Sequence, residues 1–185
     1  MANRKIGDWI RLGTKKIFEN EFFTVNADDE IEPDGKNGKY ATIDVKSGVA
    51  VLPLDDEGNV YLTRQFRYAI ERDSVEAIAG SLEGEEPLAG AKREAKEELG
   101  IEASEWTPLA KIDVLTSICR SSTNLFIAEG LTFTKPERES TEDIKQLKMP
   151  LEEVVQKVVS GEITHADTCV LVLRAWEHKK TAAAS

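Results

Sequence analysis

Short apolar groups alternate with turn residues along the first quarter of the chain. Apolar and β-branched residues recur between Lys15 and Asn26, and Glu32-Pro33-Asp34-Gly35 then gives a strong turn signal. Apolar runs of this length, bounded by turn residues, are typical of strands. Residues 1–46 are therefore predicted to form two or three short strands, which together make a small β-rich subdomain.

From residue 47 onward the chain is more apolar, and the spacing of its apolar positions changes along its length. Apolar runs of strand length predict strands, whereas recurrence at three- and four-residue spacing predicts helices. The predicted strands are 48–54, 60–66, 74–79, 106–114, 123–128 and 144–149, and the predicted helices are 87–99, 151–159 and 167–178. Residues 47–180 are thus expected to form the main domain, of α/β or α+β class, and residues 181–185 a disordered tail.

Turn and capping residues mark where several of these elements begin and end. Asp55–Asn59 is rich in turn formers, which predicts that the first two strands of the main domain form a hairpin. Pro87 in the first turn and Gly100 after the last residue bound the first helix. Asp167 is a candidate N-cap of the last helix.

The helix predicted over 87–99 carries three glutamates on one arc. At about 100° per residue, Glu98 lies about 40° from Glu94 and Glu97 about 60° to its other side, next to the apolar stripe. Like charges at these spacings destabilise an isolated helix by roughly 0.2–0.5 kcal/mol per pair. Gly90, one turn earlier on the same arc, indicates the close approach of another group. A carboxylate cluster suits Mg²⁺, although a solvated amphipathic face explains the arc better when the arc is taken alone.

The residues around this arc resemble a known motif. The run Arg93-Glu94-Ala95-Lys96-Glu97-Glu98-Leu99-Gly100-Ile101 matches the second half of the Nudix box, Arg-Glu-apolar-x-Glu-Glu-x-Gly-apolar, at every specified position. Seven residues separate Glu85 from this run, as the box requires. The box also has a glycine six residues before that glutamate, where this chain has Ala79, with Gly80 one residue later. The loop of the box therefore looks one residue shorter than usual.

The resemblance extends beyond the box to the ADP-ribose pyrophosphatases and their nucleotide-sugar relatives. It rests on Gln65–Tyr68, Glu76–Gly80, the N-terminal stretch with Trp9 and Pro33–Gly35, and Gly161–Ile163 with Ala166. It implies a Nudix fold, in which a mixed β-sheet is sandwiched between helices and a small N-terminal β-subdomain is added. It also implies a homodimer.

The same resemblance implies a metal site and the residues around it. Nudix enzymes use Mg²⁺, or alternatively Mn²⁺, to hydrolyse a nucleoside diphosphate linked to another group. By similarity the implied metal ligands are Glu94, Glu98, Glu97 and the backbone carbonyl of Ala79, with Glu97 alternatively hydrogen-bonded to the ligands. Arg93 is implied to hold a carboxylate in place, since its planar fork suits a bidentate contact. The implied structural residues of the box are Gly80, Glu85 and Gly100.

In this branch the general base often comes from an acidic loop after the box. The corresponding segment here is 137–144, in which Glu142 is the first candidate and Glu139 the second. An exposed acidic loop without a catalytic role explains each of these residues equally well. The chain lacks the Ser-Pro-Gly turn and following glutamate that many relatives have, so the resemblance does not fix ADP-ribose as the substrate.

Three further residues match positions implied to bind the substrate. Arg67 and Glu76 match positions that line the substrate pocket in this branch, with a structural salt bridge as the alternative. Arg120 stands where the relatives' turn is missing and is a candidate for contact with a phosphate or ribose. A salt-bridged surface arginine is the alternative for Arg120.

Composition and charge narrow the function classes. The chain has 185 residues with 24 Lys and Arg against 34 Asp and Glu, so its net charge is −10. This excludes a dedicated nucleic-acid or anionic-membrane binder, which needs a basic surface. The N-terminus lacks the apolar run of a signal peptide and Cys119 and Cys169 are too few for a disulfide framework, so we expect a cytoplasmic protein. Six glutamates fall within residues 81–100, which indicates that part of the acidity serves a cation site.

The expected reaction is metal-dependent hydrolysis of the pyrophosphate of ADP-ribose or a related nucleotide sugar, which yields a nucleoside monophosphate and a sugar phosphate. One alternative is a sanitising enzyme that acts on oxidised nucleoside triphosphates. The other is a nucleotide-binding module that has kept the fold and lost hydrolysis.

Overall fold

The computed structural model describes residues 3–137 and 144–183. The chain divides into two compact units. The first contains residues 1–47 together with residues 113–122, and the second contains residues 48–112 and 123–185. The predicted subdomain ended at residue 46; the structure adds the segment 113–122 to it, because the strand in that segment pairs with the N-terminal sheet.

The first unit is a five-stranded sheet with the order β1-β2-β3-β4-β10. Its strands are β1 (Arg4–Ile6), β2 (Trp9–Glu19), β3 (Phe23–Ile31), β4 (Asn37–Val45) and β10 (Cys119–Arg120). The first four are antiparallel neighbours, and β10 runs parallel to β4. The predicted turn at Glu32–Gly35 is present between β3 and β4, and Gly35 adopts a φ of +86°.

The interior of this first unit is polar. The side chains that are buried among its described residues are Asn26, Asp28, Glu30, Thr42 and Ser122. Its large apolar side chains are at most partly buried, and Ile17, Phe18 and Phe22 are exposed. The sheet therefore lacks an apolar core of its own within the part of the chain that the structure describes.

The second unit contains a four-stranded sheet with the order β8-β5-β11-β9 and a three-stranded sheet with the order β12-β6-β7. Its strands are β5 (Gly48–Pro53), β6 (Asn59–Arg67), β7 (Arg72–Glu76), β8 (Ile78–Ser81), β9 (Ile101–Asp113), β11 (Ser122–Phe133) and β12 (Lys145–Pro150). The four-stranded sheet is mixed, because β5 pairs parallel with β11 and antiparallel with β8. The helices are η1 (Tyr68–Ile70), α1 (Pro87–Leu99), α2 (Leu151–Val159) and α3 (Ala166–Ala183).

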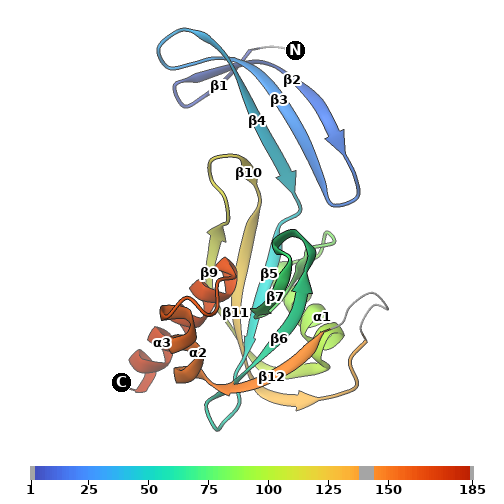
Figure 1. The fold of residues 1–185 in the computed structure, drawn as a ribbon, viewed down its shortest axis with the longest axis vertical. Helices are drawn as coiled ribbons and strands as arrows, with labels where there is room; N and C mark the ends of the chain where they lie inside the picture. Colours follow the sequence, from blue (N-terminus) through green and yellow to red (C-terminus); the bar gives the residue numbers. More distant parts are fainter. Residues whose placement is uncertain (1–2, 138–143, 184–185) are drawn as a thin grey trace. The chain divides into compact units, whose positions relative to one another are not determined.

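Helices cover both faces of the mixed sheet, as the resemblance implied (Figure 1). Val49 and Val51 of β5 pack in one apolar cluster with α1, whereas Ala50 and Leu52 pack in a second cluster with α2 and α3. This alternation follows from the two-residue period of a strand, and it buries β5 on both faces. None of the helices in the described residues is long and apolar enough to cross a membrane.

The structure differs from the sequence prediction in the arrangement of strands at two places. The predicted turn at Asp55–Asn59 is present and closes the antiparallel bridge between Leu54 and Val60, but beyond that bridge β5 and β6 belong to different sheets and do not continue as a hairpin. Both edges of β5 are already taken by β8 and β11. The single strand predicted at 74–79 is broken at Ala77, whose N–H donates to the Thr168 hydroxyl (2.8 Å) and not to a strand.

The last helix begins earlier and ends later than predicted. It starts at Ala166, and the His165 carbonyl accepts the N–H of Cys169 (2.9 Å), so Asp167 lies in the first turn and is not the N-cap. The Asp167 carboxylate instead accepts the Thr123 hydroxyl (2.8 Å). The helix continues to Ala183 through residues that were expected to be disordered, in keeping with the high helix propensity of alanine.

Candidate active site

The helix α1 begins and ends where the sequence predicts. Glu86 occupies the N-cap position with extended backbone, and Pro87 follows in the first turn. Gly100 ends the helix in the left-handed region, at a φ of +63°, with its N–H donating to the Lys96 carbonyl (2.9 Å). Glycine is required there by conformation and by space, since a Cβ at this position would lie 2.2 Å from the Thr134 carbonyl oxygen.

The three glutamates of α1 are not a simple solvated face. Glu98 is only 5% exposed, and the side chain of Glu94 is 12% exposed. The side chain of Glu97 is 40% exposed and lies nearer to the solvent. Carboxylates are rarely buried unless a partner or a cation compensates the lost hydration. The burial therefore favours a functional cluster over the amphipathic alternative.

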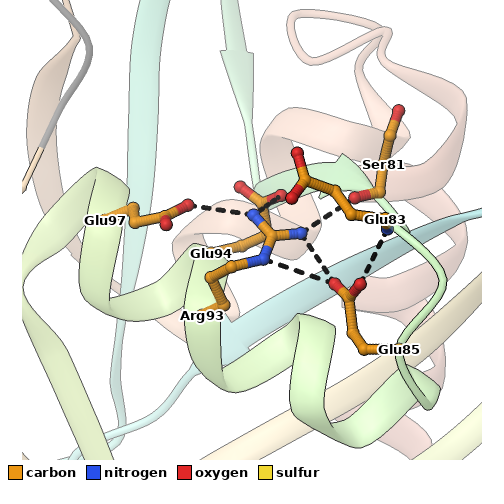
Figure 2. A network of polar contacts seen from close by, with 6 residues as sticks. All are labelled: Ser81, Glu83, Glu85, Arg93, Glu94 and Glu97. Atoms are coloured by element: carbon orange, nitrogen blue, oxygen red, sulfur yellow. Dashed lines mark hydrogen bonds and ion pairs between the residues drawn. The ribbon is translucent and has the colours of Figure 1, made fainter.

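Arg93 joins the carboxylates on both sides of it (Figure 2). Its Nη1 donates to Glu94 (2.8 Å) and to Glu97 (2.9 Å). Its Nη2 donates to Glu85 (2.9 Å) and to the backbone carbonyl of Ser81 (2.9 Å). One guanidinium thus fixes two carboxylates of the helix and ties them to the loop that precedes it. The role that the resemblance implied for Arg93 agrees with this geometry.

The charges in this network stabilise one another. Partial burial alone would lower the pKa of Arg93, but the hydrogen bond to Glu85 and the charge of Glu94 raise it above its usual value. The hydrogen bond from Arg93 in turn holds the pKa of Glu85 below its ordinary value. Glu85 also accepts the backbone N–H of Glu83 (2.8 Å), so it orders the turn of the loop. Glu85 therefore links the loop to the helix.

Two glycines let the loop and the preceding strand approach α1 closely. A Cβ on Gly80 of β8 would lie 1.9 Å from Oε1 of Glu94, so any larger residue would displace that carboxylate. A Cβ on Gly90 would lie 2.6 Å from Leu82 and 3.0 Å from Glu85. The close approach that the sequence predicted at Gly90 is thus confirmed, and the group that approaches is the loop of the box.

Among the described residues, no three or more His, Cys, Asp or Glu side chains are already arranged to hold a metal ion. Glu94 and Glu97 instead accept hydrogen bonds from Arg93. The donor chemistry nevertheless fits a hard divalent cation, because Glu94 and Glu98 offer carboxylate oxygens in positions shielded from solvent. The space that Gly80 leaves in front of Glu94 would be closed by any side chain.

A second polar cluster surrounds Glu76, which is 2% exposed. Arg67 holds its carboxylate through two contacts, Nε to Oε1 at 3.0 Å and Nη2 to Oε2 at 2.5 Å. Burial alone would raise the pKa of Glu76, but Arg67 and the charge of His165 bring it below its ordinary value. The bidentate pair is the structural salt bridge that was the alternative for these residues, and the Arg67 side chain is 43% exposed.

Sequence reasoning did not find the part that His165 takes in this cluster. Its Nε2 lies 3.9 Å from Oε2 of Glu76, and its Nδ1 lies 2.8 Å from the Thr168 hydroxyl. Thr168 is fully buried and also accepts the N–H of Ala77. No sequence signal pointed to this contact, because the residues are far apart in the chain and only the fold brings them together.

The structure describes two of the four remaining predicted residues, Arg120 and Ala79. Arg120 belongs to the first unit, where it pairs with Asp44 (3.2 Å) and Asp28 (3.5 Å), as the salt-bridge alternative described. Glu139 and Glu142, the candidates for the general base, lie outside the described residues. Ala79 is in β8 immediately before Gly80.

Comparison with known proteins identifies the family of the chain. The NUDIX domain model matches residues 45–168. The chain is 32% identical to the ADP-ribose pyrophosphatase of Bacillus subtilis (strain 168) over 164 residues, which cover 87% of this chain and 89% of the relative. It is 27% identical to the GDP-mannose pyrophosphatase of Escherichia coli O1:K1 / APEC over 180 residues, which cover 88% of this chain and 93% of the relative.

The fold has a solved counterpart as well. The crystal structure of an ADP compounds hydrolase superposes with a TM-score of 0.84 at 21% sequence identity and covers 97% of this chain and 98% of its own. The family match, the identity to the first relative and the Arg93 network within the box agree with one another. The chain therefore belongs to the NUDIX family, and within it to the branch of pyrophosphohydrolases that resembles the ADP-ribose pyrophosphatases.

Proposed function

We propose that the protein is a divalent-metal-dependent hydrolase that cleaves the pyrophosphate of ADP-ribose or a nucleotide sugar into a nucleoside monophosphate and a sugar phosphate. The observation that carries this proposal is the pair of solvent-shielded carboxylates, Glu94 and Glu98, of which Glu94 is held in place by Arg93 and by the close approach of Gly80. The names of the Bacillus subtilis and Escherichia coli relatives support this class of substrate.

The residues that would hold the cation are Glu94, Glu98, Glu97 and the backbone carbonyl of Ala79. A strand at the edge of a sheet leaves every second carbonyl without a strand partner, and β8 is such an edge strand. When bound, Mg²⁺ or Mn²⁺ supplies positive charge for the pyrophosphate oxygens and lowers the pKa of a water molecule. All four donors are oxygens, which suits both of these hard cations.

The other residues act through position and charge. Arg93 keeps Glu94 and Glu97 oriented, because it donates a hydrogen bond to both. Arg67 is held by Glu76 through two contacts, and we propose that its charge attracts a phosphate of the substrate. A general base must then take a proton from the attacking water. We propose Glu142 for this role, with Glu139 as the second candidate.

A hydrolysis screen tests the proposal. The substrates are ADP-ribose, GDP-mannose, other nucleotide sugars, dinucleotides and oxidised nucleoside triphosphates, each with Mg²⁺, with Mn²⁺ and with EDTA. We expect turnover of ADP-ribose or a nucleotide sugar, formation of the nucleoside monophosphate, and loss of activity with EDTA. Preference for oxidised triphosphates would instead support the sanitising alternative. Tight nucleotide binding without any turnover would support the binding module.

Two variants locate the activity at α1. Glu98→Gln is expected to lose most of the turnover while its circular dichroism stays unchanged. Glu102→Gln is the matched control, because Glu102 is exposed just beyond the helix and should keep the wild-type rate. Wild-type turnover of Glu98→Gln at limiting metal concentration would contradict the assignment of Glu98 as a ligand.

We also propose that two copies of the chain associate through the first unit. The pairs Phe23–Val45 and Val25–Ile43 place apolar side chains on one face of β3 and β4, and none of the four is buried. The opposite face of β3 and β4 carries the buried polar side chains of Asn26, Asp28, Glu30 and Thr42. A twofold arrangement of identical copies is the commonest way to cover such a face. Light scattering should give twice the chain mass of 20.5 kDa, and Val25→Glu should give the monomer mass if this face is the contact.

A further inference from the structure

The first unit contains a cavity lined by its own residues. Its volume is about 270 Å³, slightly below the usual range of small-molecule pockets, so only a small ligand would fit. The residues that line it come from four strands and the segment that returns beside β4: Ile6, Trp9, Arg11, Asp28, Glu30, Tyr40, Thr42 and Arg120. All of them belong to the first unit, so the cavity is complete within one part of the molecule.

Glu30 is the charged group of this cavity that lacks an opposite charge. It is 6% exposed, and it makes no hydrogen bond or ion pair with any residue that the structure describes. Arg11 stands opposite Glu30 in the register of β2 and β3, yet its guanidinium lies 3.6 Å from Asp28. Burial, together with the charges of Glu32 and Asp28, raises the pKa of Glu30 above its ordinary value. A carboxylate in such surroundings gains most from a cation.

The position of the Glu30 carboxylate is defined by Gly38, its cross-strand partner in β4. A Cβ on Gly38 would lie 2.8 Å from Oε1 of Glu30 and 2.5 Å from Oε1 of Glu32. Two carboxylates therefore meet over one glycine, which adds to the negative potential around Glu30. The two arginines of the cavity do not offset it, because Arg11 and Arg120 lie against Asp28.

A second polar group in the cavity also lacks a partner. The hydroxyl of Thr42 is buried and makes no hydrogen bond with any residue that the structure describes, and the residue is 7% exposed. Trp9 and Tyr40 supply aromatic walls, with ring centroids 5.7 Å apart and an edge-to-face arrangement. Aromatic faces attract cations, and a buried hydroxyl can accept a hydrogen bond from one. The carboxylate, the hydroxyl and the two rings thus favour the same kind of ligand.

We propose that this cavity binds a small organic cation, an ammonium or guanidinium group on a short apolar stem, through Glu30, Thr42 and the rings of Trp9 and Tyr40. The charged head would donate to the Glu30 carboxylate and the Thr42 hydroxyl, and the stem would lie against Ile6. This site goes beyond the proposed hydrolysis and does not depend on it.

Isothermal titration calorimetry on the full chain tests the proposal with four probes. Methylguanidinium and n-butylammonium are the cations, and n-butanol and butyrate are the neutral and anionic counterparts of similar size. We expect both cations to bind saturably at one site per chain, and neither counterpart to bind. Saturable butyrate binding or calcium binding that displaces the cations would overturn the proposal, because Arg120 or a metal site would then explain the cavity.

Three variants assign the binding to this cavity. Glu30→Gln should weaken cation binding about tenfold or more, since a hydrogen bond to a charged group contributes about 1.5–3 kcal/mol. Asp29→Asn is the matched control, because it removes the same charge from the next residue of β3, where Asp29 pairs with Lys39 in an exposed ion pair. Trp9→Leu should weaken methylguanidinium binding severalfold through the lost ring. Equal affinity of Glu30→Gln and wild type, or no saturation by either cation, would refute the site.

Discussion

Gly80 and Glu94 lie so close that a methyl group on the glycine would occupy the space of the carboxylate. A Cβ on Gly80 would be 1.9 Å from Oε1 and 2.0 Å from Cδ of Glu94. Glu94 is also held by Arg93 from the other side, so it has little freedom to move away. The edge strand β8 and the helix α1 thus define the place of this carboxylate together.

Gly80→Ala should therefore impair hydrolysis more than folding. The added methyl must push Glu94 aside, and a displacement of about 1 Å in a catalytic group can cost about 100-fold in rate. The measurement is kcat for the substrate identified by the screen, with circular dichroism to verify the fold. Gly13→Ala is the control, since a Cβ on Gly13 meets nothing within 4 Å and should leave kcat unchanged. Wild-type kcat in Gly80→Ala would show that the position of Glu94 is unimportant.

Arg93→Lys should weaken both activity and stability although it keeps the positive charge. A compact ammonium cannot reproduce a planar fork that contacts Glu85, Glu94 and Glu97 at once. We expect a loss of about 1–3 kcal/mol in the free energy of unfolding by urea, because partly buried carboxylates lose their partner. Arg64→Lys is the comparison, since Arg64 forms a single exposed pair with Asp73 and should change stability little. Equal effects of the two substitutions would contradict the network.

Local sequence signals predicted the bounds of α1 and the close approach at Gly90 correctly. The bounds of α1, the link from Glu85 to Arg93 and the close approach at Gly90 all depend on residues within one motif and its helical period. Such short-range constraints are visible in the sequence, because the spacing alone brings the residues together.

Features that depend on contacts between distant segments were not predictable. The contact of His165 with Glu76 forms only when α3 packs beside β7, and the break at Ala77 depends on the Thr168 hydroxyl. Glu30 shows the same limit, since a glutamate in a strand is ordinarily expected to face the solvent. Its burial follows from the polar interior of the first unit.

A comparison of Gly100 with Gly161 separates two reasons for a glycine, a positive φ angle and a lack of space for a Cβ atom. Gly100 and Gly161 both adopt positive φ angles, of +63° and +78°. A Cβ on Gly161 meets nothing within 4 Å, whereas one on Gly100 would also collide with Thr134 and Pro136. Gly161→Ala should cost about 1–2 kcal/mol in the free energy of unfolding. Gly100→Ala should cost a further ~1–3 kcal/mol, and equal losses in urea unfolding would disprove the crowding.

Asp55 should make the stability of the protein depend on acid pH. Its carboxylate receives Nζ of Lys148 (2.8 Å), the N–H of Asn59 (2.8 Å) and the hydroxyl of Tyr61 (3.1 Å). Burial alone would raise the pKa of Asp55, but these contacts, that of Lys148 foremost, lower it from 3.8 to about 2. A pKa that is lowered by folding adds stability above the unfolded value, and this contribution disappears as the pH falls from about 4 to about 2.

Asp55→Asn tests this assignment by the difference in stability from the wild type at several pH values. Near neutral pH the variant should be less stable by about 1–3 kcal/mol in urea unfolding, because Lys148 loses a charged partner. The gap should narrow steadily between about pH 4 and pH 2, as the wild-type carboxylate takes up its proton. Asp56→Asn, a change at the exposed neighbour, should show little gap at any pH. A gap for Asp55→Asn that stays constant across this range would mean that the neutral turn geometry, and not the ionised carboxylate, provides the stability.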